Sequence, residues 1–250
     1  MRHATLLGRV AATPFYRGRV AEGNLATWDR LPLTRREELL RDQLDHLPLG
    51  TRRFADAAAP VRVGVTGSGD GLLVLAWSPA ALARERAAGV RLLRRLGVGP
   101  GTRVANSLPG ALATPGALLL GDVVEEIGAL DVPLGSPDTE PAARQAWELV
   151  DRVEPAGFSG WQRHWLAVPE AASFVAHSCA ASRYHVDERV EAEVVDVESG
   201  APVAAGREGM LALTPVEGDT ALLRYASGLG ARMLPAPCGC GEAGTVMEIA

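Results

Sequence analysis

The chain of 250 residues is 47% hydrophobic and 22% charged, which suits one globular unit or two small ones and excludes intrinsic disorder. Its formal net charge of -5 argues against a nucleic-acid partner, because a phosphate-binding surface needs concentrated positive charge. No apolar run approaches the roughly 20 residues of a membrane-spanning helix, and the N-terminus lacks a signal-peptide pattern, so we expect a cytoplasmic protein without a membrane partner.

Residues 1–57 carry helical patterning that is interrupted by prolines. Within them, Thr34 is predicted to be the N-cap of a helix, and Glu37 is predicted to complete a capping box. We interpret these residues as an N-terminal helical segment.

Residues 58–172 alternate between short apolar runs and amphipathic helical patterns, which predicts an α/β layer. Strands are predicted at 61–65, 72–76 and 103–106. Helices are predicted at 79–96, 113–120 and 141–153, with a short amphipathic segment at 161–167.

Residues 173–250 lose the helical pattern and favour a small β-rich module. Strands are predicted at 190–197, 209–213 and 221–225, separated by Gly-rich turns.

All 25 residues counted as Lys or Arg are arginines, so the chain contains no lysine. Arginine stays protonated and offers a planar fork of donors where lysine offers a compact charge. Any mechanism that needs a lysine amine from this chain is therefore excluded.

Short stretches carry a resemblance that recurs in order along the chain. Residues 31–39 read Leu-Pro-Leu-Thr-Arg-Arg-Glu-Glu-Leu and follow Pro-Phe-Tyr-Arg at 14–17. Further stretches lie at 78–82, 97–104, 191–200, 206–209, 223–225 and 237–241. Together they resemble the phenylacetate-CoA ligase family of adenylate-forming enzymes over nearly all of this chain, and over part of a full-length relative.

This resemblance implies an α/β fold, namely a reduced adenylate-forming N-terminal domain with a mixed sheet and helices, followed by a small β-rich C-terminal module. It implies ATP with magnesium, and CoA, as ligands if the chain is an active acid-CoA ligase. The positions that would bind the nucleotide are Thr66, Gly67, Ser68, Gly69 and Arg224.

Four departures from the family fall where its chemistry is carried. Asp70 stands where the phosphate loop of relatives has a lysine, and a carboxylate beside a triphosphate costs about 1 to 4 kcal/mol. No aspartate follows the Arg-Tyr-Ala-Ser-Gly run at 224–228 to bind the ribose. Relatives carry most of a second α/β half at the position between Trp165 and Ser173, and a C-terminal lid, and we expect this chain to lack both. These losses predict that the chain does not adenylate a carboxylate on its own.

Other interpretations of these residues stay open. The Gly-rich stretch from Gly67 is also typical of a hairpin turn, and Arg224 also fits a buried arginine that satisfies nearby carbonyls. Two functions therefore remain: an accessory protein that binds a small carboxylate or an acyl thioester, or docks on a full-length ligase or a second copy, and a minimal ATP-dependent ligase.

Three cysteines and a histidine form the strongest candidate site. Cys179 and His185 follow a C-x5-H spacing, and Cys238 and Cys240 form a C-x-C pair on a Gly-rich turn. Four protein ligands of these types suit tetrahedral zinc and leave no open position, which predicts a structural ion. His177 is an alternative ligand, and the opposing interpretation is a set of buried thiols beside an unrelated histidine.

An aromatic group offers a weaker candidate. His164 lies between Trp161 and Trp165, and the three could line a small pocket, although a Trp pair at this spacing is more often part of a core or an interface.

Overall fold

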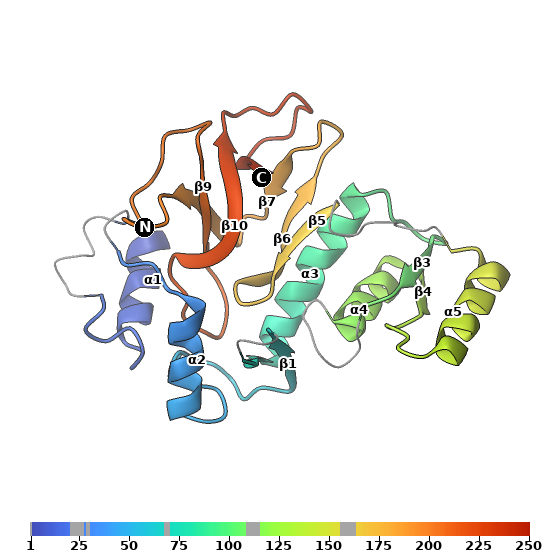
Figure 1. Cartoon of the computed structure of the whole chain (residues 1–250), viewed down its shortest axis with the longest axis horizontal. Coiled ribbons are helices and arrows are strands. Elements are labelled where there is room, and N and C mark those ends of the chain that lie inside the picture. Colours follow the sequence, from blue (N-terminus) through green and yellow to red (C-terminus); the bar gives the residue numbers. More distant parts are fainter. Residues whose placement is uncertain (1, 21–27, 29–30, 68–70, 109–115, 156–163) are drawn as a thin grey trace.

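The computed structural model describes residues 2–20, 28, 31–67, 71–108, 116–155 and 164–250. Five helices and eleven strands occur within them (Figure 1). The helices are α1 (Arg2–Ala11), α2 (Arg36–Asp45), α3 (Pro79–Arg95), α4 (Ala117–Ile127) and α5 (Glu140–Val153). The strands are β1 (Arg62–Thr66), β2 (Leu73–Trp77), β3 (Arg103–Asn106), β4 (Leu130–Pro133), β5 (Trp165–Val168), β6 (Ala172–Ser178), β7 (Tyr184–Val186), β8 (Val190–Val195), β9 (Glu208–Pro215), β10 (Tyr225–Leu234) and β11 (Val246–Ile249).

The strands form a large sheet and two small ones. Seven strands pair antiparallel in the order β5-β6-β7-β11-β10-β9-β8. β1 and β2 form an antiparallel pair, and β3 and β4 form a parallel pair. The α/β class is therefore correct, but parallel and antiparallel pairings occupy separate sheets instead of one mixed sheet. A parallel pair needs a crossover, which α4 supplies only between β3 and β4.

Two hydrophobic clusters meet on opposite faces of β6. Val175 belongs to the first cluster, which joins α1, α2 and the large sheet, while the adjacent Phe174 belongs to the second, which joins α3, α4 and β3. Both side chains are fully buried. Figure 1 shows α3 lying along β6, between the large sheet and α4.

The N-terminal segment packs on the large sheet through polar contacts as well as apolar ones. The Tyr16 hydroxyl bonds to the Thr34 hydroxyl at 2.8 Å and accepts the backbone N–H of Leu223 at 2.9 Å. The prediction that Thr34 is the N-cap of α2 is therefore wrong, because its hydroxyl is bonded to that of Tyr16. Arg35 is the N-cap, and the prediction that Glu37 completes the capping box is wrong by one residue, because Glu38 accepts the backbone N–H of Arg35 at 2.8 Å.

Three predicted elements differ in kind or position. Within 161–167, the described residues do not continue as an amphipathic segment, because Trp165 begins strand β5 and pairs with β6. The strand predicted at 221–225 begins only at Tyr225, and the preceding apolar residues are buried in a connection that ends at Arg224, whose φ is +43°. The helix predicted at 113–120 is α4 and extends to Ile127, while 113–115 lie outside the described residues.

The predicted division into 1–57, 58–172 and 173–250 stays a prediction. No helix in the described part of the chain is long and apolar enough to cross a bilayer.

Candidate metal centre and nucleotide loop

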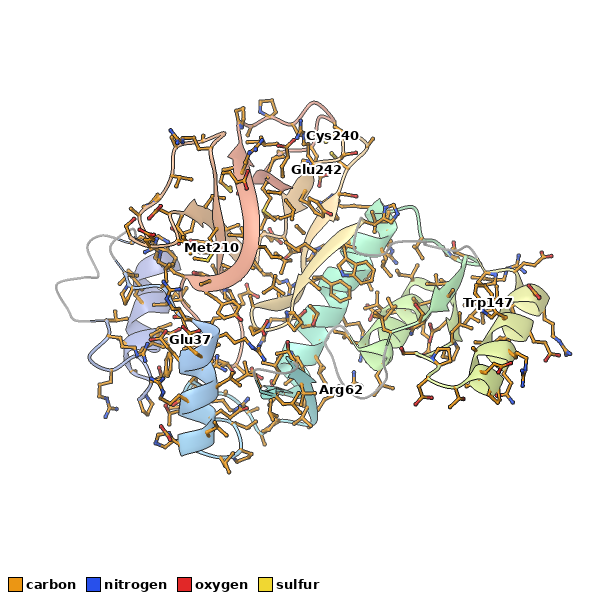
Figure 2. The ribbon with its side chains drawn as sticks, in the orientation of Figure 1. Glu37, Arg62, Trp147, Met210, Cys240 and Glu242 are labelled. Atoms are coloured by element: carbon orange, nitrogen blue, oxygen red, sulfur yellow. The ribbon has the colours of Figure 1, made fainter. Side chains whose placement is uncertain are left out.

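The four predicted metal ligands come together at one end of the large sheet. Cys179 lies in the turn between β6 and β7, and His185 lies in β7. Cys238 and Cys240 lie in the connection between β10 and β11. β11 pairs with β7, Val246 opposite His185, so the two connections meet there (Figure 2).

The donor atoms of these four residues lie within 4.8 Å of one another, so the group could hold a metal ion. Cys179 Sγ is 3.8 Å from Cys238 Sγ, and Cys240 Sγ is 3.3 Å from His185 Nε2. A tetrahedral zinc ion separates its sulfur and nitrogen ligands by about 3.5 to 3.8 Å. The residue types and the spacing of their donor atoms therefore fit that ion.

Glu242 links the cluster to its surroundings. Its Oε2 lies 3.8 Å from His185 Nδ1, a buried atom that has no hydrogen-bond partner in the described structure. The same carboxylate lies 3.0 Å from His177 Nε2 and pairs with Arg95. Histidines that bind metals commonly donate their second nitrogen to a carboxylate, so Glu242 is placed to orient the His185 ring.

His177 is held beside the cluster and is not one of its four donors. It faces His185 across β6 and β7, and the two rings stack with centroids 5.4 Å apart. Burial lowers the pKa of His177, against the effect of Glu242.

The thiols differ in acidity. Burial raises the pKa of Cys179, but hydrogen bonds from the backbone at Arg183 and Ala181, and from His185 and Cys240, lower it to about 6. The N–H of Glu242 lowers the pKa of Cys240, but burial and the two other thiols raise it overall. Cys179 is thus predisposed to the thiolate form that binds metals.

The described ends of the stretch that resembles a phosphate loop contact an arginine. Arg36 Nη2 donates to the carbonyls of Thr66 at 2.8 Å and Gly71 at 3.1 Å. A Cβ at Gly67, where φ is +107°, would lie 1.9 Å from the same nitrogen. Ser68 and Gly69, predicted to contact nucleotide, and Asp70 lie outside the described residues.

Arg36 is itself neutralised. Its Nη1 pairs with Glu170, which also accepts the Thr66 hydroxyl at 3.1 Å. Tyr225 is influenced by both members of this pair. Burial raises the pKa of its hydroxyl, Glu170 raises that pKa further, and Arg36 lowers it. The carbonyls of the two loop ends therefore face a cation that already has a carboxylate partner.

Arg224 is held by a carboxylate and by backbone carbonyls. Its guanidinium is 1% exposed and forms a two-point pair with Glu193, at 2.7 and 3.0 Å. It also donates to the carbonyls of Leu31 and Gly200. These contacts favour the interpretation of Arg224 as a buried structural arginine.

The described members of the predicted aromatic group, His164 and Trp165, lie in different surroundings. Trp165 is buried in the second cluster, with its ring centroid 5.5 Å from that of Phe174, and His164 lines the open surface beside the cysteines. Trp161 lies outside the described residues.

Sequence reasoning missed Arg36, Glu170 and Glu242. Glu242 stands two residues after Cys240, which was a usable signal for a ligand-orienting carboxylate. Arg36 lies in the stretch at 31–39 and Glu170 is 134 residues away from it, so only the fold reveals their pairing.

Comparisons with known proteins place this geometry in a known fold. No family profile matches the sequence, and neither does any curated protein. A crystal structure of 2-hydroxyisobutyryl-CoA ligase in the postadenylation state, in complex with 2-HIB-AMP, matches with a TM-score of 0.81 and 16% identity over 98% of this chain. An open conformation of this ligase with 2-HIB-AMP and CoA matches with a TM-score of 0.76, 16% identity and 99% of this chain covered.

The chain spans 64% of the length of the first of these ligase structures and 71% of the second. At 16% identity the likeness concerns the fold alone. The described residues therefore adopt, over most of their length, the fold of an adenylate-forming acyl-CoA ligase.

Proposed function

We propose that this protein is a phenylacetate-CoA ligase-like accessory protein that binds a small carboxylate or an acyl thioester and does not adenylate it alone. The observation that supports this proposal is the position of Arg36. Its guanidinium lies between the carbonyls of Thr66 and Gly71, where a nucleotide-binding loop would present its amides to a phosphate.

The charges around this loop argue in the same direction. A phosphate held there would have to replace Glu170 as the partner of Arg36 and would lie close to that carboxylate. The chain has no lysine to contribute a second compact charge. Stabilisation of developing charge usually supplies several kcal/mol of the barrier reduction in such transfers, so its loss supports an inactive site.

We further propose that the Cys179, His185, Cys238 and Cys240 group binds one zinc ion. Four protein donors would saturate a tetrahedral ion, so the ion would hold the two connections together and would supply no reactive water. Reduced cysteines of this kind are typical of the cytoplasm, where we place the protein.

The accessory role also includes binding to another protein, through the surface formed by α5 and the β3–β4 sheet. α5 has no buried residues, and Trp147 on it is 69% exposed, at the end of the molecule far from α1 (Figure 2). β3 and β4 form a parallel sheet of two strands, whereas parallel sheets are usually covered on both faces. This surface supports docking of a full-length ligase or a second copy of the chain.

The alternative is a minimal ATP-dependent acyl- or aryl-CoA ligase, which would use ATP with magnesium and CoA. Its support is the fold that the chain shares with ligase structures crystallised with 2-HIB-AMP. In that case Arg36 would have to release Glu170 and bind the nucleotide phosphates itself.

Titration calorimetry with ATP and magnesium, and pyrophosphate release over a panel of aryl and alkyl carboxylates with CoA, distinguish the two. 2-Hydroxyisobutyryl-CoA ligase with its own acid serves as the positive control. We expect no pyrophosphate from this chain, together with saturable binding of a carboxylate or thioester. Pyrophosphate release that disappears in Arg36→Gln would establish the ligase alternative.

A further inference from the structure

A polar cavity away from the cysteines is lined by residues from both halves of the chain. Its volume is about 90 Å³, and it is enclosed by β2, the start of α3, the turn between β5 and β6, and residues 215–220. Arg52 and Arg53, which precede β1, contribute to its wall. None of its lining residues belongs to the Cys/His group.

Arg52 is a buried cation whose hydrogen bonds are incomplete. The residue is 4% exposed, and its Nε is buried without a partner in the described structure. The hydrogen bond from its Nη1 to the carbonyl of Ala221 is 3.5 Å long and therefore weak. Leaving a charged donor buried and unpaired costs several kcal/mol, so the native state should supply an acceptor.

The acids near Arg52 are engaged elsewhere. Asp42 accepts the backbone N–H of Thr51 at 2.8 Å and its hydroxyl at 2.6 Å. Glu170 accepts Arg36 and the Thr66 hydroxyl. Neither carboxylate forms a hydrogen bond or ion pair with Arg52 in the described structure.

Arg53 also lines this cavity, and its hydrogen bonds are also incomplete. Its Nη2 donates to the carbonyl of Ala58 at 2.6 Å, while its Nη1 is buried without a partner. Two of the five buried polar side-chain atoms that lack partners in the described residues therefore belong to consecutive arginines on one wall.

The other charged residues that line the cavity do not supply the missing hydrogen-bond partners of Arg52 and Arg53 in the described structure. Arg84 pairs with Asp219 at 3.3 Å, and Arg189 pairs with Glu85 at 3.1 Å. Glu217 is exposed to solvent. Arg52 and Arg53 are thus the lining arginines that have no carboxylate partner in the described structure.

We propose that this cavity binds a small carboxylate on Arg52. A planar carboxylate matches the donor fork of a guanidinium and can accept from it at two points. Cavities of roughly 150 Å³ hold benzene, so a cavity of about 90 Å³ takes an anion of the size of formate or acetate and excludes an aryl acid. This deepens the proposed function, on whose carboxylate binding it rests, by naming a site and a size class.

Titration of the whole chain with acetate, formate, benzoate and inorganic phosphate, at constant ionic strength, tests the site. We expect saturable binding of acetate and formate, and no binding of benzoate. Arg52→Gln should weaken acetate binding about 10- to 100-fold, as expected for loss of a charge-assisted hydrogen bond. Arg52→Lys, which keeps the charge, should weaken it less. Arg62→Gln, which removes an ion pair with Asp122 outside the cavity, is the matched control and should leave binding unchanged.

NMR spectroscopy of the wild-type chain provides a second readout that is independent of the affinity measurements. The Arg52 Nε–H, which has no partner in the described structure, should give a 15N–1H resonance that shifts on addition of acetate, identified by its absence in Arg52→Lys. Phosphate binding without acetate binding would overturn the carboxylate assignment. Acetate that binds equally well to Arg52→Gln would overturn the site while leaving the proposed function standing. ATP-dependent pyrophosphate release would overturn the proposed function without bearing on the site.

Discussion

The buried guanidinium of Arg224 joins three segments that are distant in sequence. It pairs with Glu193 on β8 and donates to the carbonyls of Leu31 and Gly200. Removing one partner of a buried ion pair typically costs about 3 to 5 kcal/mol, because the other charge is left unpaired. We therefore expect Arg224→Met to lower the free energy of unfolding by about that amount in urea denaturation.

The control for this variant is Arg232→Met, which removes an exposed pair with Glu208. Exposed pairs contribute about 0 to 1 kcal/mol, so this variant should unfold nearly like wild type. If Arg224→Met has wild-type stability but loses nucleotide binding, the structural interpretation of Arg224 is wrong.

Asp131 on β4 illustrates a pH dependence with a defined sign. Burial raises its pKa, against a hydrogen bond from Asn106, and Glu125 raises it further. Because the folded pKa lies above the unfolded one, the folded state binds more protons and loses stability as pH rises through this interval. Asp131→Asn should therefore stabilise the protein at pH 7.5, and the gain should shrink toward pH 4.

Asp196 provides the control of opposite sign. Hydrogen bonds from the backbone and side chain of Ser199 lower its pKa. Its ionised form therefore stabilises the fold above the unfolded pKa, and that contribution is lost at low pH. Asp196→Asn should destabilise the protein at pH 7.5 and still do so near pH 4, and the loss should shrink only as the pH falls further, toward 2. The same sign for both variants in pH-dependent thermal unfolding would contradict the argument.

At the scale of elements, α3 approaches β6 and α4 closely at Gly89. A Cβ added there would lie 2.6 Å from Val123 Cγ2 and 2.7 Å from Phe174 Cε2. Alanine improves helix propensity by about 1 kcal/mol, but overpacking a core costs about 1 to 3 kcal/mol. Gly89→Ala should therefore be neutral or destabilising by up to about 2 kcal/mol in urea denaturation.

The same substitution in α1 should have the opposite sign. Gly8 is exposed, and nothing lies within 4 Å of its added Cβ. Gly8→Ala should stabilise the protein by about 0.5 to 1 kcal/mol. If Gly89→Ala stabilises it as much as Gly8→Ala does, α3 is not in close contact with Phe174.

Elements with a clear period could be predicted from the sequence, and elements without one could not. The helices at 79–96 and 141–153 are confirmed as α3 and α5 because their apolar residues follow the helical repeat. β6 was missed because both of its faces are buried, so its residues do not alternate. β7, with three residues, is too short to show any period.

One candidate site could likewise be predicted from the sequence, and the other could not. Cys179, His185, Cys238 and Cys240 could be singled out because ligand type and local spacing are visible in the sequence. Arg52 could not, because an arginine in a chain with 25 of them carries no signal until the fold buries it without a partner. Burial and distant pairing are properties of the assembled molecule.

At the scale of the whole molecule, the exposed face of α5 predicts association. Trp147 on this helix is 69% exposed, and α5 has no buried residue. If a second copy covers it, sedimentation velocity of wild type should show mass increasing with concentration, and Trp147→Ser should remain a monomer. A monomer at all concentrations for both chains would leave a different protein, such as a full-length ligase, as the partner to test.

The proposed zinc ion would act on the whole sheet, because its ligands connect the β6 to β7 turn with the connection between β10 and β11. Structural zinc contributes folding free energy directly, since the unfolded chain does not preserve the site. We expect about one zinc per chain by elemental analysis. A strong chelator, or Cys238→Ala, should release the ion and lower the unfolding temperature. Cys238→Ala is the informative thiol variant because Cys238 is buried and its Sγ lies 3.8 Å from that of Cys179.

Two further variants separate metal binding from simple packing. Glu242→Gln should keep the ion but weaken its affinity about 10- to 100-fold, because the carboxylate only orients His185. His46→Ala, on an exposed histidine far from the cysteines in sequence, should change neither zinc content nor stability. Native protein that contains no zinc, reacts at all three thiols and unfolds identically with and without chelator would show that the cluster is a set of free cysteines.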